Sequence, residues 1–334
     1  VGGHSIAGPL LVVLGPGKYS IAMLAHDRHF WCRPAVVLYA CLALLLPLSP
    51  ASSQTVDLSA ALLAYGEGNY DQAFPGFKRG AEQGSAEAQY WLGLLYDRGQ
   101  GVAQDRERAY QWFLKAAAQG YPEAQRVVGV YLEEGEVIAR DLEQAAAWYQ
   151  RAVAQNNDKA MRNLAQLYIR GRGVVRNFDK GARLLRRAAD MGNLKAMRNL
   201  GYLYYFGKGV PRDPGAAATL FSKAAKAGLD KAQYNLGFVH YRGDGVPKDL
   251  AKAAYQFGQA ADQGNADAQL MLSRMYLLGE GLTADPAKAF FWALLGAVQK
   301  PELAEWHFDK LRGLLSSAQM DNIREQGKAW NPKG

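Results

Sequence analysis

Residues 88–123 read AQYWLGLLYDRGQGVAQDRERAYQWFLKAAAQGYPE, and the chain repeats this 36-residue unit with variations. The opening Ala-Gln pair returns as Ala-Gln or Ala-Met at residues 124, 160, 196, 232 and 268. Asp or Asn recurs at residues 105, 141, 177, 213, 249 and 285, and Gly recurs at residues 99, 135, 171, 207, 243 and 279. Small residues recur in the same way from Ala73 to Ala289. Four series with one period indicate an internal repeat architecture.

Each unit is predicted to contain two helices. Across residues 106–118, Ala109, Phe113 and Ala116 follow the spacing of one apolar helix face. Asp105 precedes this helix as an expected N-cap, because its side-chain oxygen can accept hydrogen bonds from unpaired backbone N–H groups. The other helix is expected from about residue 86 to residue 96, with a glycine loop between the two.

A glycine in the middle of that other helix is unexpected, because it costs about 1 kcal/mol relative to alanine. The same position holds a small residue in every unit, namely Gly93, Gly129, Ala165, Gly201, Gly237 and Ser273. We therefore expect a neighbouring helix to approach the backbone closely at this position.

One helix pair alone cannot bury its apolar face, so neighbouring pairs must stack. The predicted fold is all-α: a right-handed superhelical α-solenoid of about seven helix-turn-helix repeats with a C-terminal helical cap. Residues 54–84 are interpreted as a degenerate N-terminal helix pair and residues 85–296 as the regular repeats. Residues 297–334 are expected to form capping helices, at residues 301–315 and 316–330.

The units resemble Sel-one-like repeats (SLR), a family related to the tetratricopeptide repeat. The resemblance is carried by AQYWLGLLY at residues 88–96, by the GKGV loop at residues 207–210, and by the helix that follows that loop. It covers roughly residues 56–330. The chain departs from the family pattern at two places. Val137 replaces the second loop glycine of one unit, and His240 replaces the tyrosine of another unit. The resemblance implies an adaptor or regulatory role in assembling complexes, often at the bacterial envelope.

The N-terminal region differs from the repeats. Residues 35–48 form an uncharged apolar run of 14 residues that follows Arg28 and Arg33 and precedes small residues. This pattern predicts a secretory signal peptide, and the run is short for a membrane span. We interpret residues 1–53 as an upstream extension plus a signal peptide that is removed. Cleavage is expected after Ala51 or Ser53, and Met23 is expected to be the true start.

Removal of the signal peptide would change the chemistry available to the chain. Three of the 39 basic and one of the 31 acidic residues would leave, so 36 basic and 30 acidic residues would give a net charge of +6. Cys32 and Cys41 would leave as well, which excludes disulfides and thiolate metal ligands. His240 and His307 alone make a poor zinc site. We therefore expect no metal, no cofactor and no integral membrane span in a periplasmic or secreted mature chain.

The sequence gives little support for catalysis. The Gly-x-Gly loops lack the preceding strand of a dinucleotide-binding loop and the Gly-Lys-Ser/Thr ending of a phosphate-binding loop. The chain has neither a Gly-x-Ser-x-Gly elbow nor a His-Glu-x-x-His pair. Glu133 and Glu134 are expected to be solvated, and His307 is expected on the surface of a capping helix. We predict that the protein is not an enzyme; a cell-wall hydrolase is the less favoured alternative.

The resemblance also implies which residues face a partner, because the first helix of each tetratricopeptide-like pair lines the concave surface. Lys159, Lys195 and Lys231 then form one row, and Arg162 and Arg198 form a second row beside aromatic residues. The predicted partner-binding residues are Arg126, Lys159, Arg162, Lys195, Arg198, Tyr202, Tyr205, Phe206, Lys231, Tyr234, Phe238, Tyr241 and Arg242. In the alternative interpretation, the cations are simply solvated and the aromatic side chains belong to the core.

Arginine suits bidentate contacts with carboxylates, and aromatic side chains supply rigid contact area. We therefore expect an exported scaffold that docks an acidic protein segment of an envelope partner, in envelope signalling or exopolysaccharide assembly. An acidic polysaccharide or a peptidoglycan fragment on the same residues is the alternative ligand. Basic and aromatic residues also suit nucleic acid, but export argues against that partner.

Overall fold

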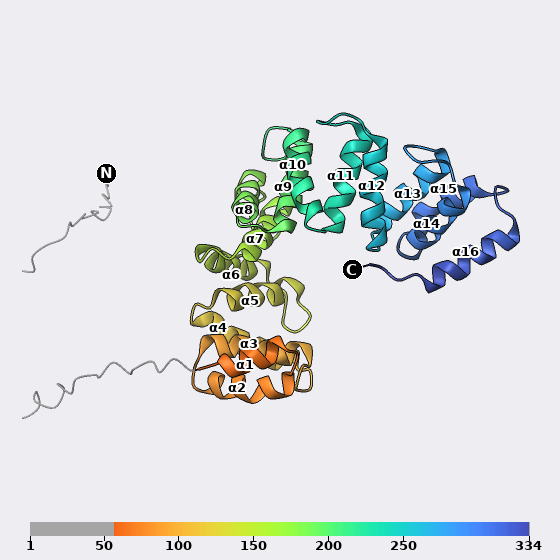
Figure 1. Ribbon diagram of the computed structural model, residues 1–334. Helices are drawn as coiled ribbons and strands as arrows, with labels where there is room; N and C mark the ends of the chain where they lie inside the picture. The colour runs from red at the N-terminus through yellow and green to blue at the C-terminus, as the bar shows by residue number, and fades with distance from the viewer. Residues whose placement is uncertain (1–56, 334) are drawn as a thin grey trace, which may run out of the picture. The chain divides into compact units, whose positions relative to one another are not determined.

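The computed structural model describes residues 57–333, and this range contains sixteen α-helices and no strand (Figure 1). The residues predicted as upstream extension and signal peptide lie outside the described range. The helices are α1 Ser59–Gly66, α2 Tyr70–Glu82, α3 Ala86–Arg98, α4 Arg106–Ala118, α5 Pro122–Glu134, α6 Leu142–Ala154, α7 Asp158–Arg170, α8 Phe178–Asp190, α9 Leu194–Phe206, α10 Pro214–Lys226, α11 Asp230–Arg242, α12 Leu250–Asp262, α13 Ala266–Leu278, α14 Pro286–Gln299, α15 Pro301–Leu311 and α16 Ser317–Ala329.

The helices pack in chain order. In each repeat the two helices pack on each other, as α3 does on α4, and the second helix then packs on the first helix of the next repeat, as α4 does on α5. Seven such pairs run from α1 to α14, and α15 and α16 pack on α14 (Figure 1). The prediction of an all-α solenoid of helix pairs is confirmed.

The helix ends form as the sequence indicates. Asp105 Oδ1 accepts a hydrogen bond from the Arg108 backbone N–H at 2.8 Å, and Asp213 caps α10 in the same way at 2.9 Å. Pro214 occupies the first position of its helix, where no N–H donor is needed. Gly99 follows α3 with a φ of 66°, a left-handed conformation that glycine adopts without strain.

The small residue in the middle of the first helix faces an aromatic ring of the second. A Cβ added to Gly93 would lie 2.7 Å from Phe113 Cε1, and one added to Gly201 would lie 2.7 Å from Phe221 Cε1. Where alanine replaces this glycine, at Ala165, the residue equivalent to the ring is Leu185. The expected close approach of a neighbouring helix is confirmed, and its closeness depends on the size of the opposing side chain.

The second glycine of the loop touches the preceding repeat in five of the six loops. Gly209 has a φ of 70°, and a Cβ there would lie 2.4 Å from the backbone carbonyl carbon of Phe178. Equivalent glycines at residues 101, 173, 245 and 281 make the same approach to the first residue of the preceding second helix. At Val137, which replaces this glycine, the residue equivalent to Phe178 is Arg106.

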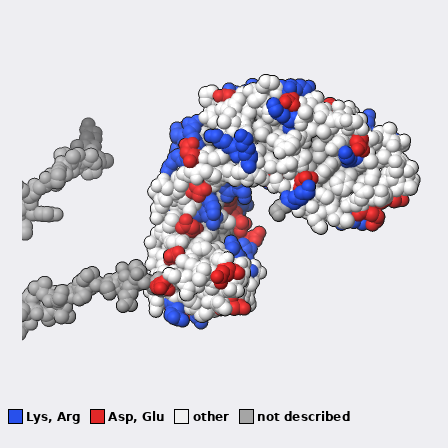
Figure 2. All heavy atoms as spheres, in the orientation of Figure 1, with Lys and Arg blue, Asp and Glu red and all other residues white. Residues whose placement is uncertain are grey.

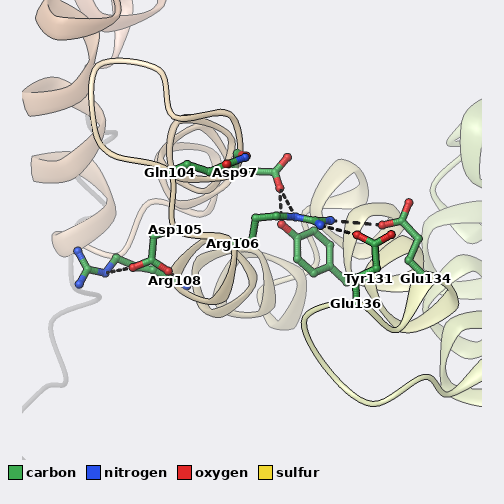
Figure 3. A network of polar contacts seen from close by, with 8 residues as sticks. All are labelled: Asp97, Gln104, Asp105, Arg106, Arg108, Tyr131, Glu134 and Glu136. Carbon is green, nitrogen blue, oxygen red and sulfur yellow. Dashed lines mark hydrogen bonds and ion pairs between the residues drawn. The ribbon is translucent and has the colours of Figure 1, made fainter.

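Arg106 holds the exceptional loop through a polar network (Figure 3). Its guanidinium lies 2.6 Å from Glu136 Oε2, 3.4 Å from Glu134 Oε2 and 3.5 Å from Asp97 Oδ1. The Tyr131 hydroxyl donates to the same Asp97 oxygen at 2.5 Å. The loop that lacks the glycine is thus tied to its neighbour by ion pairs.

Two expectations about single polar residues are wrong. Glu133 is half-buried and accepts a hydrogen bond from the Tyr149 hydroxyl at 2.9 Å, so it is not merely solvated. His307 is only 7% exposed, because its face of α15 packs inward. Ser273 Oγ donates to the Ala289 carbonyl at 2.7 Å, so its oxygen is left to accept from His307 Nδ1 at 2.9 Å. Burial, reinforced by the charge of Arg274, lowers the pKa of His307 to about 4.

Candidate partner-binding face

All thirteen predicted partner-binding residues lie on the first helices of four consecutive repeats. Arg126 is on α5, two of the residues are on α7, and five each are on α9 and α11. None of them is fully buried, and Tyr202 and Phe206 are 45% and 50% exposed. The alternative that these aromatic residues belong to the core is therefore wrong for the α9 pair. We call the exposed side of α5, α7, α9 and α11 that carries the thirteen residues the binding face.

Arg126, Arg162 and Arg198 occupy one recurring position and form a row of half-buried cations. Burial lowers the pKa of Arg162, and the charge of Arg126 lowers that pKa further. Burial likewise lowers the pKa of Arg198; the charge of Asp230 partly opposes this shift, and the charge of Arg162 adds to it. Arg126 thus destabilises the charged form of Arg162, and Arg162 destabilises that of Arg198.

No carboxylate compensates these charges directly. Within residues 57–333, none of the three guanidinium groups has a carboxylate oxygen within 4.0 Å. Arg162 donates one N–H to Asn163 Oδ1 at 2.8 Å, and Arg198 donates one to Asn199 Oδ1 at 2.6 Å. The buried Nε atoms of Arg126 and Arg162 have no hydrogen-bond partner in the structure. Buried cations with spare donors favour the binding of an anion.

The lysine row lies beside the arginine row. Lys159, Lys195 and Lys231 are exposed and occupy the first turn of α7, α9 and α11. The helix dipole disfavours a cation at this end of a helix, so the lysines do not stabilise their own helices. They extend the positive surface toward one edge of the binding face.

An aromatic pocket adjoins the arginine row. Its cavity volume is about 190 Å³, and its walls are Tyr202, Tyr205, Phe206, Phe221, Tyr234, Asn235, Phe238 and Val239. The ring centroids of Tyr202 and Phe206 lie 4.5 Å apart, and Lys208 Nζ lies 5.5 Å from the first centroid and 5.6 Å from the second. Tyr234 on α11 occupies the position that Arg198 occupies on α9. The pocket therefore lies one repeat beyond the last arginine of the row.

Two of the predicted residues, Tyr205 and Tyr241, also hold the repeats together, and Arg242 pairs within its own repeat. The Tyr205 hydroxyl donates to Asp244 of the next repeat, and Arg242 Nε lies 3.7 Å from the same carboxylate. The Tyr241 hydroxyl donates to Glu280 at 2.9 Å. Burial, together with Asp244, raises the pKa of Tyr205 to about 12, so its hydroxyl stays neutral. The accessible centre of the pocket is therefore Tyr202 and Phe206.

Sequence reasoning missed several residues of this face. Asn163 and Asn199 orient the arginines, and Asn235 lines the pocket at the equivalent position. Lys208 covers the two exposed rings from the following loop. The repeated Arg-Asn pair at residues 162–163 and 198–199 is the sequence signal that indicates the first two.

Residues 57–333 contain no group of three or more His, Cys, Asp or Glu side chains placed to hold a metal ion. Between the same limits, no helix has the length and hydrophobicity required to cross a membrane.

A stack of helix pairs with an exposed polar and aromatic face defines a tetratricopeptide-like repeat scaffold. The Sel1 repeat model matches residues 86–121, 122–157, 158–193, 194–229, 230–265 and 266–297, and the chain belongs to the Sel1 repeat family. Sel1 repeats are typical of protein-interaction modules and are usually non-catalytic. No curated protein matches the chain.

The chain is also similar to several solved structures. A Sel1 repeat protein from Oxalobacter formigenes is 33% identical with a TM-score of 0.68, and the match covers 72% of this chain and 96% of that one. The protein c5321, a protective antigen of uropathogenic Escherichia coli with an SLR fold, is 24% identical with a TM-score of 0.45, and the match covers 80% and 82%. A sel1 repeat protein from Klebsiella pneumoniae is 22% identical with a TM-score of 0.43, over 61% and 99%.

Proposed function

We propose that this protein is an exported scaffold that docks an acidic segment of an envelope protein on its binding face. The observation that carries the proposal is the row of Arg126, Arg162 and Arg198, which are half-buried and have no carboxylate within 4.0 Å in the described chain. An acidic segment would supply the missing carboxylates to all three. The signal-peptide pattern before residue 54 supports export.

The energetics favour a partner over solvent at these arginines. The pKa values of Arg162 and Arg198 fall chiefly because burial removes water from the charged groups. A carboxylate that meets a partly desolvated guanidinium forms a charge-assisted hydrogen bond, often through two parallel contacts. The neighbouring asparagines each accept one N–H, which fixes the orientation of the planar group before a partner arrives.

The aromatic pocket supplies the apolar part of the proposed interface. Exposed Tyr202 and Phe206 would lose their contact with water under a partner. Buried aromatic anchors beside charged contacts are the usual hot spots of protein interfaces, and truncating one costs about 2 kcal/mol or more. An acidic segment with an apolar side chain would engage both features.

The test begins with crosslinking in intact cells and mass spectrometry to identify the partner. Binding of that partner is then measured for Arg162→Gln/Arg198→Gln and Arg162→Glu/Arg198→Glu, and for the control Lys223→Glu/Lys226→Glu on α10. We expect charge reversal on the binding face to weaken affinity about a hundredfold or more, the milder pair to weaken it less, and the control to leave it unchanged. Circular dichroism and melting temperature report whether each variant is folded.

The outcomes separate the candidate partners. An acidic polysaccharide or peptidoglycan fragment that binds the face, with no crosslinked protein, would replace the proposed protein partner. Unchanged affinity of a crosslinked partner for a folded Arg162→Glu/Arg198→Glu variant would refute the binding face itself. Recovery of the protein only in the cytoplasm would refute the proposed export.

A further inference from the structure

A tryptophan recurs on the second helix of the repeat, and in two of its three copies a cation covers the ring. The position holds Trp112, Trp148 and Trp292 in three repeats. Lys115 Nζ lies 4.0 Å from the ring centroid of Trp112, and Arg151 Cζ lies 4.3 Å from that of Trp148. Both distances fall within the range of cation–π attraction. This place on the repeat thus accommodates a flat aromatic ring beneath a cation.

The third repeat has Leu184 at this position, and a cavity lies beside it. The cavity volume is about 310 Å³, and its lining consists of Leu164 and Tyr168 from α7 with Lys180, Arg183, Leu184 and Arg187 from α8. Arg187 is the equivalent of Lys115 and Arg151, but the indole that they cover is absent beneath it. It donates instead to Asn156 Oδ1 at 3.1 Å. In this repeat the cation is present and the ring is absent.

The region around this cavity is strongly basic. Residues 151–198 contain 12 basic and three acidic residues, an excess of nine that exceeds the net charge of +8 for the whole chain. Figure 2 shows Lys and Arg side chains gathered over the part of the surface that α8 occupies in Figure 1. The excess of positive charge therefore lies at the cavity as well as on the binding face.

The three cations that line the cavity differ in their partners. Arg183 pairs with Asp179 at 2.5 Å on the exposed side of α8. Lys180 Nζ lies 5.5 Å from the centroid of Tyr168, and in the described chain neither Lys180 nor Arg187 has a carboxylate within 4.0 Å. These two cations can accept an acidic group from a ligand without breaking an existing ion pair.

We propose that the cavity beside Leu184 binds a small molecule in which a planar aromatic ring carries a carboxylate. The ring takes the place of the indole of the sister repeats, over Leu184 and under Arg187. The carboxylate meets Lys180 and Arg187, the cations that lack an acidic partner. The site uses α7 and α8 residues that are not among the thirteen of the binding face, so it does not depend on the proposed function.

The repeats supply the variants that test this site. Leu184→Trp introduces the residue that three sister repeats already carry, so it fills the cavity without changing the charge. Lys180→Gln/Arg187→Gln introduces the residues found at the equivalent Gln144 and Gln259, so it removes the charge and keeps the cavity. Leu220→Trp makes the same substitution in the next repeat and serves as the matched control.

The probe is indole-3-acetate, titrated into the full chain by calorimetry and by ligand-observed NMR, with indole and acetate as separate ring and carboxylate controls. We expect saturable binding at one site, with indole and acetate each at least about tenfold weaker. Leu184→Trp and Lys180→Gln/Arg187→Gln should each weaken binding about tenfold or more, and Leu220→Trp should leave it unchanged.

Two results would overturn the proposal. One is the absence of saturable indole-3-acetate binding to the folded wild-type chain. The other is affinity that survives in both test variants, or in whichever of them is folded by circular dichroism. If Leu184→Trp unfolds the chain, the charge variant decides the question, because its substitutions lie on the exposed side of α8.

Discussion

Gly201 and Phe221 pack against each other across the α9–α10 hairpin, and the third repeat carries Ala165 and Leu185 at the same two positions. This difference allows size complementarity to be tested within one chain. A Cβ placed on Gly201 would lie 2.7 Å from Phe221 Cε1 and 3.0 Å and 3.1 Å from Cδ1 and Cζ. Phe221 is 3% exposed, so its ring has little room to move away.

The expected free energies follow from these contacts. Gly201→Ala should gain about 1 kcal/mol of helix propensity and lose about 1–3 kcal/mol to overpacking, a net loss of about 1 kcal/mol. Phe221→Leu should cost about 1–2 kcal/mol, because it leaves a cavity against the glycine. The double variant reproduces the third-repeat pair: the added methyl fills part of that cavity and no ring opposes it. Its stability should lie within about 1 kcal/mol of wild type.

The assay is a double-mutant cycle by equilibrium urea unfolding, with hydrogen exchange of α9 amides as a local measure. Local exchange is needed because stability in repeat arrays is the sum of units and interfaces, and global unfolding can lose its two-state character. We expect a favourable coupling free energy of at least about 1 kcal/mol. If the effects of the two single substitutions simply add, size complementarity does not set the helix spacing and the explanation of the mid-helix glycine is refuted.

Three further outcomes are expected. Because the pKa of His307 falls to about 4 on folding, the unfolded chain binds the extra proton first. Stability should decline as pH falls from 6.5 to 4, by at most about 3 kcal/mol, and the melting temperature of His307→Gln should lack this slope. Gly209→Val should destabilise by about 2 kcal/mol or more in urea unfolding, because its φ of 70° and its contact with the Phe178 backbone exclude a side chain. Arg106→Ala should lower unfolding free energy by about 1 kcal/mol, and less at high salt, because its ion pairs with Glu136 and its neighbours are partly exposed.

The fold could be predicted because the same types of residue recur at the same positions of every repeat. Asp105, Gly99 and Gly93 each belong to a series, and a series separates a structural requirement from chance. The cap, the left-handed turn and the close helix approach all follow from general chemistry at those positions. Six aligned copies therefore specify one local geometry far better than a single copy would.

The wrong expectations concern residues for which the repeat gives no guidance. His307 lies on α15, beyond the last repeat, so no sister position shows which of its faces is buried. Glu133 accepts a hydrogen bond from the hydroxyl of Tyr149 on the next helix, and the 36-residue period does not predict this contact between residues that are 16 apart. Solvent exposure was the default expectation in both cases, and packing between elements decided otherwise.

The candidate site shows the same contrast: the sequence predicted which helix faces carry the residues, and it did not predict their side-chain contacts. The resemblance to tetratricopeptide-like repeats predicted which helix faces carry Arg162 and Tyr202, and both lie on the exposed side of a first helix. It did not predict that Asn163 accepts from Arg162, or that Tyr205 and Tyr241 donate to loop carboxylates of the next repeat. Those contacts depend on rotamers and loop positions that a repeat pattern leaves open.

Variation among the repeats also distinguishes structural from functional polar residues. Gln119 Nε2 donates to Gln89 Oε1 at 2.8 Å, and Gln263 donates to Gln233 at the same distance, whereas the equivalent pair in the third repeat is Met161 and Met191. In the third repeat both glutamines are therefore replaced. The same holds for the pair Gly201 and Phe221, whose equivalents there are Ala165 and Leu185. Likewise, the loop with Val137 in place of glycine is the loop that Arg106 holds by ion pairs. In each case a change at one structural position is matched by a change at its partner.

The cations on the two proposed surfaces do not follow that rule. Arg162 and Arg198 are half-buried with no carboxylate within 4.0 Å in the described chain, and the exposed Arg187 has Leu184 in place of a ring beneath it. Partial burial without a close carboxylate lowers the stability that Arg162 and Arg198 give the folded chain, so we attribute these two arginines to the proposed partner. We expect neutral substitutions at Arg162 and Arg198 to raise the melting temperature while they weaken partner binding. A lower melting temperature in the neutral variants would show that the arginines stabilise the fold, and would remove this reason for assigning them to a partner.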